Sequence, residues 1–433
     1  MTMQEPSPWK KTILAAMTSY IDAGSIVAGA AGLSLWQAYL GMSGFQMGLL
    51  AALSSNAASA AVGALIGGRI CDKYGRKFVY TYDLLIYIVG MLLIVFGVNY
   101  PMLLGGYIIV GLGVGADVVA SWTLIAEEAP AKDRAKHCGS AQFAWALGPA
   151  VVLLMSAWLN TYGLLGNRIV FAHLIIIAAW VWYQRLKMPE SKDWRAAKEE
   201  EERLIREGKV EKVSYATLLS GINLKTVLFL CGVYTIWNLC ASTWGFFMPY
   251  IFENVGKLSN SVSQLMSVGS FVISFLSTFF IFMQLGDRVS RRLLYGIIGG
   301  IYVIAWFVWT LPADMLSMWM LIMFVVFAGV NNGSGQQAFY QLWCSELFPT
   351  KYRATAQGLT FFITRILAAI WGFSVPMIME AFGFRYAAML IVAFAAISWL
   401  IGTIGAPNTE GKTLKQIEIE RYGHEQQFTA FET

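Results

Sequence analysis

The chain has 433 residues, of which 57% are apolar and only 13% are charged. Typical soluble domains contain roughly 25% charged residues, so the composition excludes an ordinary soluble enzyme or binding module. The net charge of +5 comes from short basic clusters between apolar runs, which does not indicate a nucleic-acid partner. Runs of about 20 apolar residues recur along the chain, as expected of membrane-spanning helices.

In chain order, the hydropathy pattern predicts twelve spanning helices. The predicted segments are 12–40, 45–70, 78–98, 101–127, 138–160, 168–186, 224–252, 262–285, 292–311, 315–345, 355–380 and 385–405. A polar stretch after the sixth segment contains AAKEEEERLIREGK, which is typical of a solvated amphipathic helix. The sequence thus predicts an all-α membrane protein with two six-helix halves. The predicted divisions are a first half (1–186), a linker (187–223), a second half (224–406) and a tail (407–433).

The positive charges predict the orientation of these helices. With the N-terminus placed in the cytoplasm, the cytoplasmic tails and loops hold 27 of the 31 Lys and Arg residues. Membrane proteins carry this excess on their cytoplasmic side. We therefore expect a multi-pass protein of the plasma membrane, in bacteria the inner membrane, with both termini in the cytoplasm.

Three pairs of charged motifs repeat between the halves at nearly constant spacing. The motif E-x-x-P-x-x-x-R begins at Glu127 and again at Glu346, 219 residues later. The motif D-[KR]-x-x-R-[KR] begins at Asp72 and Asp287, and the segments PESKDW and PNTEGKTL follow the sixth and twelfth helices. This register predicts a tandem duplication of a six-helix unit, and parallel repeats are typical of carriers that rock about a site between their halves.

The repeated motifs place carboxylates and cations together at predicted cytoplasmic helix ends. Asp72 could cap a neighbouring helix N-terminus or pair with a cation there, and the acid and arginine of each octet could brace the facing helix ends. Such pairs must break when an inner gate opens, so they would bias the conformational equilibrium. The alternative is a purely topological role. The predicted latch residues are Asp72, Arg76, Glu127, Arg134, Asp287, Arg291, Glu346 and Arg353.

These motifs also match those of a known carrier family. The matching residues are Gly68-x-x-x-Asp72-Lys73-x-Gly75-Arg76-Lys77, the two octets, Pro189-Glu190-Ser191 and Pro407-x-Thr409-x-Gly411-Lys412. With them the chain resembles the major facilitator superfamily, and specifically its sugar porter branch, over residues 12–420. The resemblance implies the major facilitator fold and proton-coupled import of a sugar or sugar-derived solute by alternating access.

Charged residues inside predicted spans are functional candidates, because charge is costly to bury in a membrane. Asp22 lies about eleven residues, or roughly 16 Å, into the first helix and matches the aspartate that proton-coupled sugar porters use for coupling. Asp117, in the fourth helix, is a second proton-coupling candidate or a packed hydrogen-bonding residue. Arg365, in the eleventh helix, needs a counter-ion, which could be either aspartate or an anionic substrate. We expect Asp83 to belong to the gate and His173 to be a packed histidine.

Polar and aromatic residues predict a solute site between the halves. In the tenth helix, Asn332, Gln336 and Tyr340 share one face at four-residue spacing, and amides suit hydroxyl groups because they both donate and accept. Gln142 matches a sugar-contacting glutamine of sugar porters. Packing is the alternative for each. The predicted substrate-binding residues are Gln142, Trp145, Trp237, Asn331, Asn332, Gln336, Gln337, Tyr340 and Arg365.

The chain departs from the sugar porter pattern at several of the family's positions. Ile236-Trp237 and Ser242 stand where sugar porters usually carry a Gln-Gln pair and an Asn, and Tyr107 stands where they carry an Arg. Together with Arg365, these departures favour a modified or acidic sugar, or another small organic anion, over a neutral hexose.

The sequence predicts a transporter and not an enzyme, because it shows no nucleophile–base set, phosphate loop or metal-ligand cluster. Its five cysteines lie in or beside apolar runs, which predicts free thiols. We expect no cofactor or metal, and a monomer in the lipid bilayer whose partners are a small-molecule substrate and protons. An exporter of amphipathic compounds, an organic-ion carrier and a non-transporting nutrient sensor remain alternatives. A larger apolar cavity would favour the exporter, and long cytoplasmic tails would favour the sensor.

Overall fold

The computed structural model describes residues 6–53, 57–208 and 214–429. Helices form all of the regular structure in these three ranges. In the first half they are α1 (Pro8–Leu40), α2 (Gly44–Ala52), α3 (Ala58–Tyr74), α4 (Arg76–Val95), α5 (Tyr100–Glu128), η1 (Ala131–Asp133), α6 (Arg134–Trp158), η2 (Asn160–Tyr162) and α7 (Gly163–Arg185).

The linker, the second half and the tail are also built from helices. The linker contains α8 (Lys192–Arg206) and α9 (Tyr215–Leu218), and the tail contains α18 (Leu414–Thr429). The second half comprises α10 (Gly221–Asn254), α11 (Asn260–Ser277), η3 (Thr278–Phe282), α12 (Met283–Leu285), α13 (Arg291–Phe307), η4 (Val308–Thr310), η5 (Ala313–Met315), α14 (Met318–Ser334), α15 (Gln336–Leu347), α16 (Arg353–Phe382) and α17 (Phe384–Gly405).

The predicted spanning segments are confirmed as helical. Eleven helical segments among the described residues are long and apolar enough to cross a membrane. The predicted segment 45–70 corresponds to α2 and the 17-residue α3, and its residues 54–56 lie outside the described part of the chain. The predicted segment 315–345 is divided at Gly335 into α14 and α15, and 262–285 includes the π-helical turn η3.

Local sequence signals set several helix ends. Ser7 caps α1 by accepting the Lys10 N–H, and Pro8 follows it at the first helical position, where proline is well tolerated. Asn99 caps α5 through the Met102 N–H in the same way. These caps hold the starts of two helices that later contribute charged residues to the protein interior.

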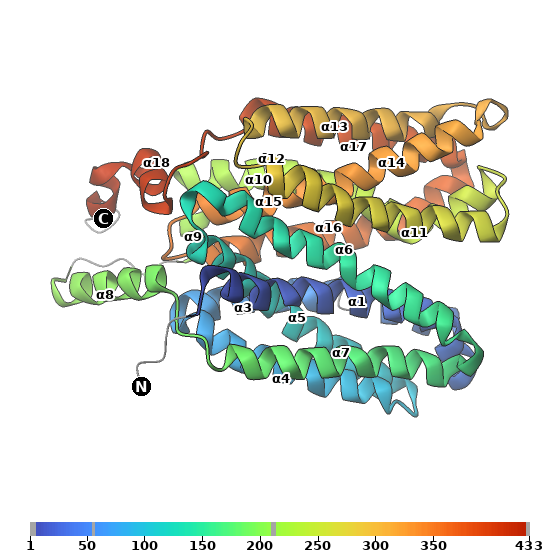
Figure 1. Ribbon diagram of the computed structural model, residues 1–433, viewed down its shortest axis with the longest axis horizontal. Helices are drawn as coiled ribbons and strands as arrows, with labels where there is room; N and C mark the ends of the chain where they lie inside the picture. Colours follow the sequence, from blue (N-terminus) through green and yellow to red (C-terminus); the bar gives the residue numbers. More distant parts are fainter. Residues whose placement is uncertain (1–5, 54–56, 209–213, 430–433) are drawn as a thin grey trace.

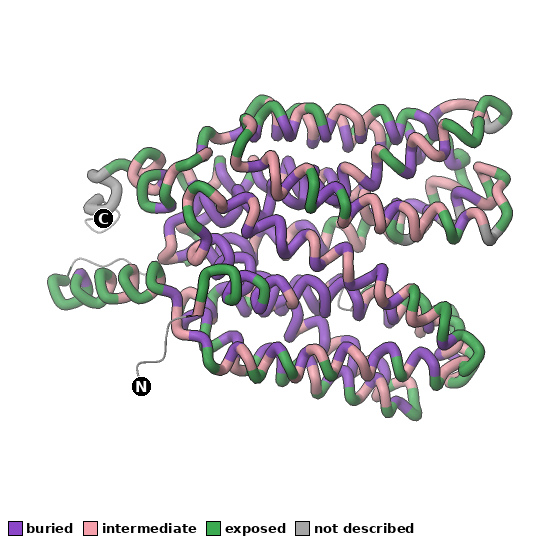
Figure 2. The backbone as a smooth tube through the Cα atoms, viewed as in Figure 1, coloured by how far each residue is buried: buried purple, intermediate pink, exposed green. Residues whose placement is uncertain are grey.

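The two halves lie one above the other in Figure 1, with the second half uppermost. The first turn of α1, the linker helix α8 and the tail helix α18 all lie at one end of the bundle, which we call the collar end. Extensive contacts between α16 and α3, and between α11 and α6, join the halves. Figure 2 shows buried residues gathered where the halves face each other, and α15 is buried along its whole length.

Glycines permit the closest helix approaches. A Cβ at Gly115 of α5 would collide with the Ala60 backbone oxygen of α3, and a Cβ at Gly68 of α3 would collide with the Ala354 backbone oxygen of α16. Small residues let membrane helices pack closely in this way. The contact at Gly68 matters for function, because it brings the start of α16 from the second half against the end of α3 from the first.

Candidate functional site

A cavity lies between the halves and is lined by both. Its volume is 130 Å³, against 660 Å³ for a second cavity at the collar end. Aromatic rings and amides dominate the smaller one, whereas charged groups dominate the other. The central cavity is lined by Ala23, Ile26, Val27, Ala30, Trp145, Pro149, Tyr234, Trp237, Asn238, Ala241, Ser242, Trp244, Gly245, Phe271, Asn332, Gln337 and Arg365.

Five of the nine predicted substrate-binding residues line this cavity: Trp145, Trp237, Asn332, Gln337 and Arg365. The break between α14 and α15 at Gly335 positions the two amides, and interrupted helices often line such sites in carriers. The side-chain Nδ2 of Asn332 is buried and makes no hydrogen bond among the described residues. It is therefore available to a bound solute.

The other four predicted residues lie behind the cavity wall and support it. Asn331 Oδ1 accepts the indole N–H of Trp237 at 2.9 Å, and its Nδ2 donates to Gln336 Oε1 at 2.6 Å. Gln142 Nε2 of the first half donates to the backbone oxygen of Asn332 at 2.7 Å. The Tyr340 and Thr360 hydroxyls are 2.7 Å apart. The contacts of Asn331 and Gln142 hold the lining residues Trp237 and Asn332, a role that helical spacing alone does not distinguish from solute contact.

Sequence reasoning missed several lining residues on α10 and α11. Tyr234, Asn238, Trp244 and Phe271 all face the cavity. The signal for Asn238 was its place directly after Trp237, where α10 enters the site. The aromatic residues carried no such signal, because the sequence has 16 Trp, 19 Tyr and 27 Phe.

Asp22 lies in α1 directly before the cavity-lining Ala23. The residue is only 3% exposed, and its Oδ1 has no hydrogen-bond partner among the described residues. Arg365 of α16 is close enough for the two charges to interact. The guanidinium carbon of Arg365 lies 4.7 Å from the centre of the Phe361 ring. An acid of the first half thus lies directly before a cavity-lining residue, and a basic residue of the second half lines the same cavity.

Asp117 does not belong to this pair of charges. Arg185 Nη1 lies 2.8 and 2.9 Å from its two carboxylate oxygens, and the Thr18 and Ser121 hydroxyls donate to it at 2.8 Å. This geometry favours the packed alternative for Asp117. Arg185 falls at the end of the predicted segment 168–186, and the sequence analysis did not name it as a site residue. Two acids in neighbouring helices, Asp83 and Asp117, were the available signal that a buried cation was needed.

His173 matches the expectation of a packed histidine. Its Nδ1 lies 2.7 Å from the backbone oxygen of Val170, and its Nε2 lies 3.2 Å from the Tyr20 hydroxyl. The five cysteines are free thiols, as predicted. The described residues contain no cluster of His, Cys, Asp and Glu that could hold a metal ion.

Two ion pairs connect the halves at the collar end. Arg353 Nη1 lies 2.9 Å from Glu127 Oε1, and Arg134 Nη1 lies 3.0 Å from Glu346 Oε1. The predicted pairing inside each octet is therefore corrected, because each arginine contacts the acid of the other octet. The reason is geometric: Arg134 and Arg353 begin α6 and α16, which pack against the opposite half.

Each glutamate also binds an arginine of its own half. Arg76 Nη2 lies 2.6 Å from Glu127 Oε1, and Arg291 Nη1 lies 2.8 Å from Glu346 Oε2. All four side chains are at most 1% exposed. We call the two crossed pairs, with these two supporting arginines, the inner latch. Burial makes each partner dependent on the others, since an unpaired buried charge is strongly destabilising.

Aspartates cap helices across the same interface. Asp72 accepts the N–H groups of Ala354 and Thr355 at 3.2 and 2.7 Å, at the start of α16. Asp287 accepts the equivalent two N–H groups at the start of α6, at 2.9 Å each. An acid at a helix N-terminus satisfies free N–H donors and the helix dipole. At the collar end, an aspartate of each half thus caps a helix of the other half.

Residues 12–373 match the sequence profile of the Major Facilitator Superfamily. The chain belongs to the major facilitator superfamily. The transporter is 52% identical over 418 residues, 96% of this chain and 95% of the relative, to the minor myo-inositol transporter IolF of Bacillus subtilis (strain 168). It is 26% identical to the glucose transporter GlcP of Staphylococcus epidermidis (strain ATCC 12228 / FDA PCI 1200), over 85% of this chain and 87% of the relative.

Solved structures agree on the fold. The proton:xylose symporter XylE bound to 6-bromo-6-deoxy-D-glucose matches with a TM-score of 0.81 and 18% identity, covering 95% of this chain and 98% of that chain. The protein is therefore a multi-pass membrane transporter with the twelve-helix fold of its family, and not an enzyme.

The transporter uses its third repeated motif to support the inner latch, a function that sequence reasoning did not assign. Glu190, in PESKDW, accepts the N–H groups of Arg76 and Lys77 at 3.1 and 3.0 Å. Glu410, in PNTEGKTL, accepts the Arg291 N–H at 2.8 Å. Each acid therefore caps the helix whose first residue is a latch arginine. The presence of an acid in both segments was the signal that could have indicated this.

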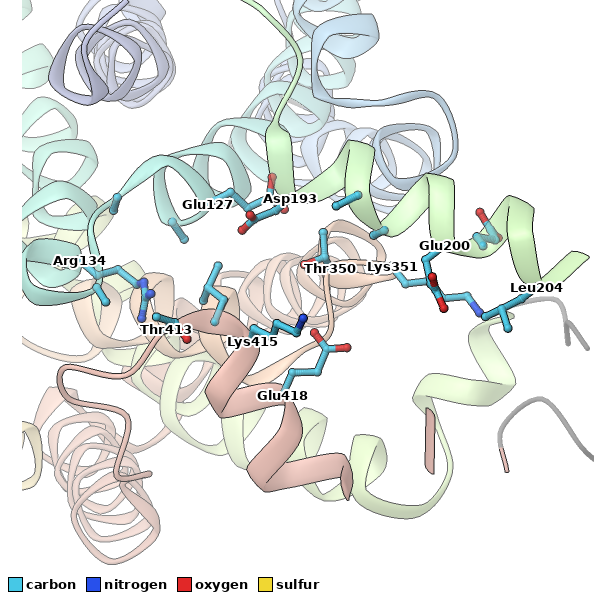
Figure 3. A pocket seen from close by; sticks show the side chains of 17 residues that line it. Glu127, Arg134, Asp193, Glu200, Leu204, Thr350, Lys351, Thr413, Lys415 and Glu418 are labelled. Atoms are coloured by element: carbon cyan, nitrogen blue, oxygen red, sulfur yellow. The ribbon is translucent and has the colours of Figure 1, made fainter. Parts of the chain in front are cut away.

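The larger cavity lies at the collar end, beside the inner latch. Figure 3 shows acidic and basic side chains from α8, α18 and the latch directed toward it. Its lining includes Glu127 and Arg134 of the latch, Asp193 of α8, and Lys415 and Glu418 of α18. This mixture of charges distinguishes it from the central cavity, whose lining is mostly aromatic, amide and aliphatic.

Carboxyl groups at the collar end predict an effect of pH on the transporter. Burial raises the pKa of Glu418 above its ordinary value, although Arg353 and Lys415 oppose the rise. Burial also raises the pKa of Asp287, against the opposing N–H donors of α6 and Arg291. A raised pKa means that the closed collar binds a proton more tightly than a collar whose carboxyls are solvated. Acidification from neutral pH should therefore stabilise the closed collar.

We expect spin-label distances between α8 and α18 to show a larger closed population at mildly acidic than at neutral pH. Glu418→Gln should remove part of this pH response, because it deletes one titrating carboxyl. The matched control is Glu420→Gln, which changes a largely exposed acid on the same helix. An open population that grows on acidification would contradict the prediction.

Proposed function

We propose that the transporter imports a neutral cyclic polyol of the myo-inositol class together with protons. The observation that carries this proposal is the 52% identity, over 96% of the chain, to a protein named as a minor myo-inositol transporter. Inositol is a six-membered ring bearing a hydroxyl on every carbon. The cavity offers amide donors and acceptors from Asn238, Asn332 and Gln337 for hydroxyls, and the rings of Trp145 and Trp237 for the apolar faces of the ring.

The proposed direction of transport follows from the charges at the two ends. The loops that carry 27 of the 31 Lys and Arg residues include those at the collar end, so the collar end is assigned to the cytoplasm. The inner latch then closes the cytoplasmic side, and the solute enters the cavity from outside. The halves 1–186 and 224–406 would move as bodies joined by the linker 187–223, with the tail 407–433 completing the collar.

In the proposed cycle, Asp22 binds the proton that drives import. A protonated Asp22 no longer attracts Arg365, and solute binding beside Arg365 draws the two halves together. The crossed pairs of the inner latch then separate, and the site opens to the cytoplasm. Alternating access of this kind needs only a shift in the balance between the state that is open to the outside and the state that is open to the cytoplasm.

The contact that Arg365 would make differs between a neutral and an acidic solute. A sugar acid would form a charge-assisted contact with the guanidinium, worth roughly 1.5–3 kcal/mol. A neutral polyol would leave Arg365 to interact with Asp22 once Asp22 has released its proton. The similarity to an inositol transporter favours the second arrangement over the acidic solute suggested by the sequence.

The test is uptake into proteoliposomes with an imposed inward proton gradient. We expect accumulation of myo-inositol that collapses when an uncoupler dissipates the gradient, with competition from other cyclic polyols and little from glucuronate. Arg365→Gln should impair coupling but should not selectively weaken the binding of acidic competitors. Strong competition by glucuronate that Arg365→Gln abolishes would instead support the organic-anion alternative. Efflux of amphipathic dyes without uptake of inositol would support the exporter.

A further inference from the structure

Three charged side chains form a buried group inside the first half, away from the solute cavity. Asp83 of α4, Asp117 of α5 and Arg185 of α7 are each at most 1% exposed. Backbone oxygens of Leu14 and Ala15 in α1 accept further N–H bonds from Arg185. The group thus connects four helices of one half, and none of its members lines the central cavity.

Asp117 has the contacts of an ionised carboxylate. Both of its oxygens accept from Arg185 Nη1, and each also accepts from a hydroxyl, Thr18 Oγ1 or Ser121 Oγ. Such a carboxylate accepts only, and all of these partners can donate. Arg185 and Asp117 therefore form a complete, mutually neutralising pair.

Asp83 is a second carboxyl facing the same single cation. Its Oδ1 accepts the backbone N–H of Leu84 at 2.5 Å, while its Oδ2 lies 4.0 Å from Arg185 Nη1. This Oδ2 is buried and makes no hydrogen bond within the described residues. It has no donor to stabilise a negative charge, in contrast to either oxygen of Asp117.

Within the described part of the chain, no second positive charge faces Asp83. The charged residues that face Asp83 are Asp117 and Arg185. Tyr80 packs its ring on Arg185, with 4.5 Å from the guanidinium carbon to the ring centre, and its hydroxyl donates to the Ala120 backbone oxygen. Cys71 is a further titratable neighbour of Tyr80, and it carries no positive charge in either protonation state. Two ionised carboxylates beside one guanidinium would leave a net negative charge with no access to water, which is strongly unfavourable.

We propose that Asp83 holds a resident proton, so that Asp83, Asp117 and Arg185 together carry no net charge. The proton resides on the carboxyl oxygen that lacks a donor, and the protonated carboxyl can itself donate toward Asp117. The group is a second protonation site, distinct from Asp22.

The resident proton is not the transported one. All four helices of the group belong to the same half, so rocking of the halves leaves its contacts intact, and it has no contact with the cavity from which a coupled proton would be taken. This step rests on the proposed proton coupling, whereas the charge state of Asp83 does not.

Infrared difference spectroscopy on the purified transporter tests the charge state directly. Asp22→Asn is used as the background, so that Asp22 cannot contribute. Adding Asp83→Asn should remove one carbonyl band of a protonated carboxylic acid, and adding Asp314→Asn, at an exposed residue, should remove none. An unchanged carboxylic-acid region after Asp83→Asn would overturn the proposal.

Thermal unfolding provides an independent test. It compares the stability of variants in which Asp83, Asp117 and Arg185 are replaced by neutral residues in turn. Asp83→Asn alone should be tolerated, because it replaces a neutral carboxyl with a neutral amide. Asp83→Asn with Asp117→Asn should lower the folded-to-unfolded ratio on the order of 100-fold, because Arg185 then lacks a counter-ion. Adding Arg185→Gln should restore part of this loss. If Asp83→Asn alone lowered the stability as much as the double variant does, the proposal would be contradicted.

Transport measurements then test whether the proton on Asp83, unlike the proton on Asp22, stays in place during transport. Asp83→Asn should leave the number of protons carried per solute unchanged in the otherwise wild-type protein. If that number falls while the infrared result holds, the proton exists but is transported. The assignment of a resident proton would then be wrong.

Discussion

Asp22→Asn is expected to abolish proton-driven accumulation of solute while leaving solute exchange across the membrane intact. Asp22 is 3% exposed, and its Oδ1 has no hydrogen-bond partner among the described residues. It lies next to the cavity wall and within electrostatic range of Arg365. Asparagine keeps the shape of the protonated carboxyl but cannot release a proton, so the variant should cycle without coupling.

The expected effect is large. A charge that moves through 100 mV gains about 2.3 kcal/mol, which supports a concentration ratio of roughly 50-fold for one proton per solute. Wild-type proteoliposomes at that potential should approach such a ratio, and Asp22→Asn should fall to about one. Counterflow of labelled inositol should persist in the variant and show that it is folded. Asp83→Asn is the matched control, a buried acid of the same half. A variant at Asp22 that still accumulates solute would place the coupled proton elsewhere.

Sequence alone could predict the arrangement of helices, because the signals for it are local. Apolar runs mark spans, and the repeated octets mark equivalent positions in the two halves. A constant spacing of 219 residues shows that Glu127 and Glu346 are equivalent. Equivalence does not show contact, however, and so the crossed pairing with Arg353 and Arg134 required the structure.

The candidate site was only partly predictable for the same reason. Four-residue spacing places Asn332, Gln336 and Tyr340 on one helix face, but it does not show that α14 ends before α15 begins at Gln336. This break directs Asn332 to the cavity and leaves Gln336 to bind Asn331. Likewise, hydropathy placed Arg185 at a helix end, whereas the fold turns it inward toward Asp117.

The crossed pairs of the inner latch predict the second large effect. Arg353→Ala removes a contact between the halves, yet Glu127 keeps Arg76 as a buried partner. The loss is therefore that of a charged hydrogen bond rather than of an entire buried pair, about 1.5–3 kcal/mol. Because this contact exists only while the collar is closed, its loss should shift the balance toward the inward-open state by roughly 10- to 100-fold.

Arg134→Ala should act in the same direction, since Glu346 keeps Arg291. If the two crossed pairs are independent, the double variant should show the sum of the two free-energy changes. Accessibility of a cysteine introduced in the cavity to an impermeant reagent, applied from each side, measures the balance. Solute affinity in the outward-open state should not change, because the latch does not line the cavity.

A matched control tests whether the shift comes from loss of a latch pair or from removal of any cation at the collar end. Arg203→Ala breaks an ion pair with Glu200 whose side chains are 61% and 50% exposed, and exposed pairs contribute little. It should leave the accessibility balance unchanged. Equal shifts for Arg203→Ala and Arg353→Ala would mean that the cations act only through membrane topology. A shift confined to Arg134 and Arg353 would show that the same two octets that repeat in the sequence hold the cytoplasmic gate closed.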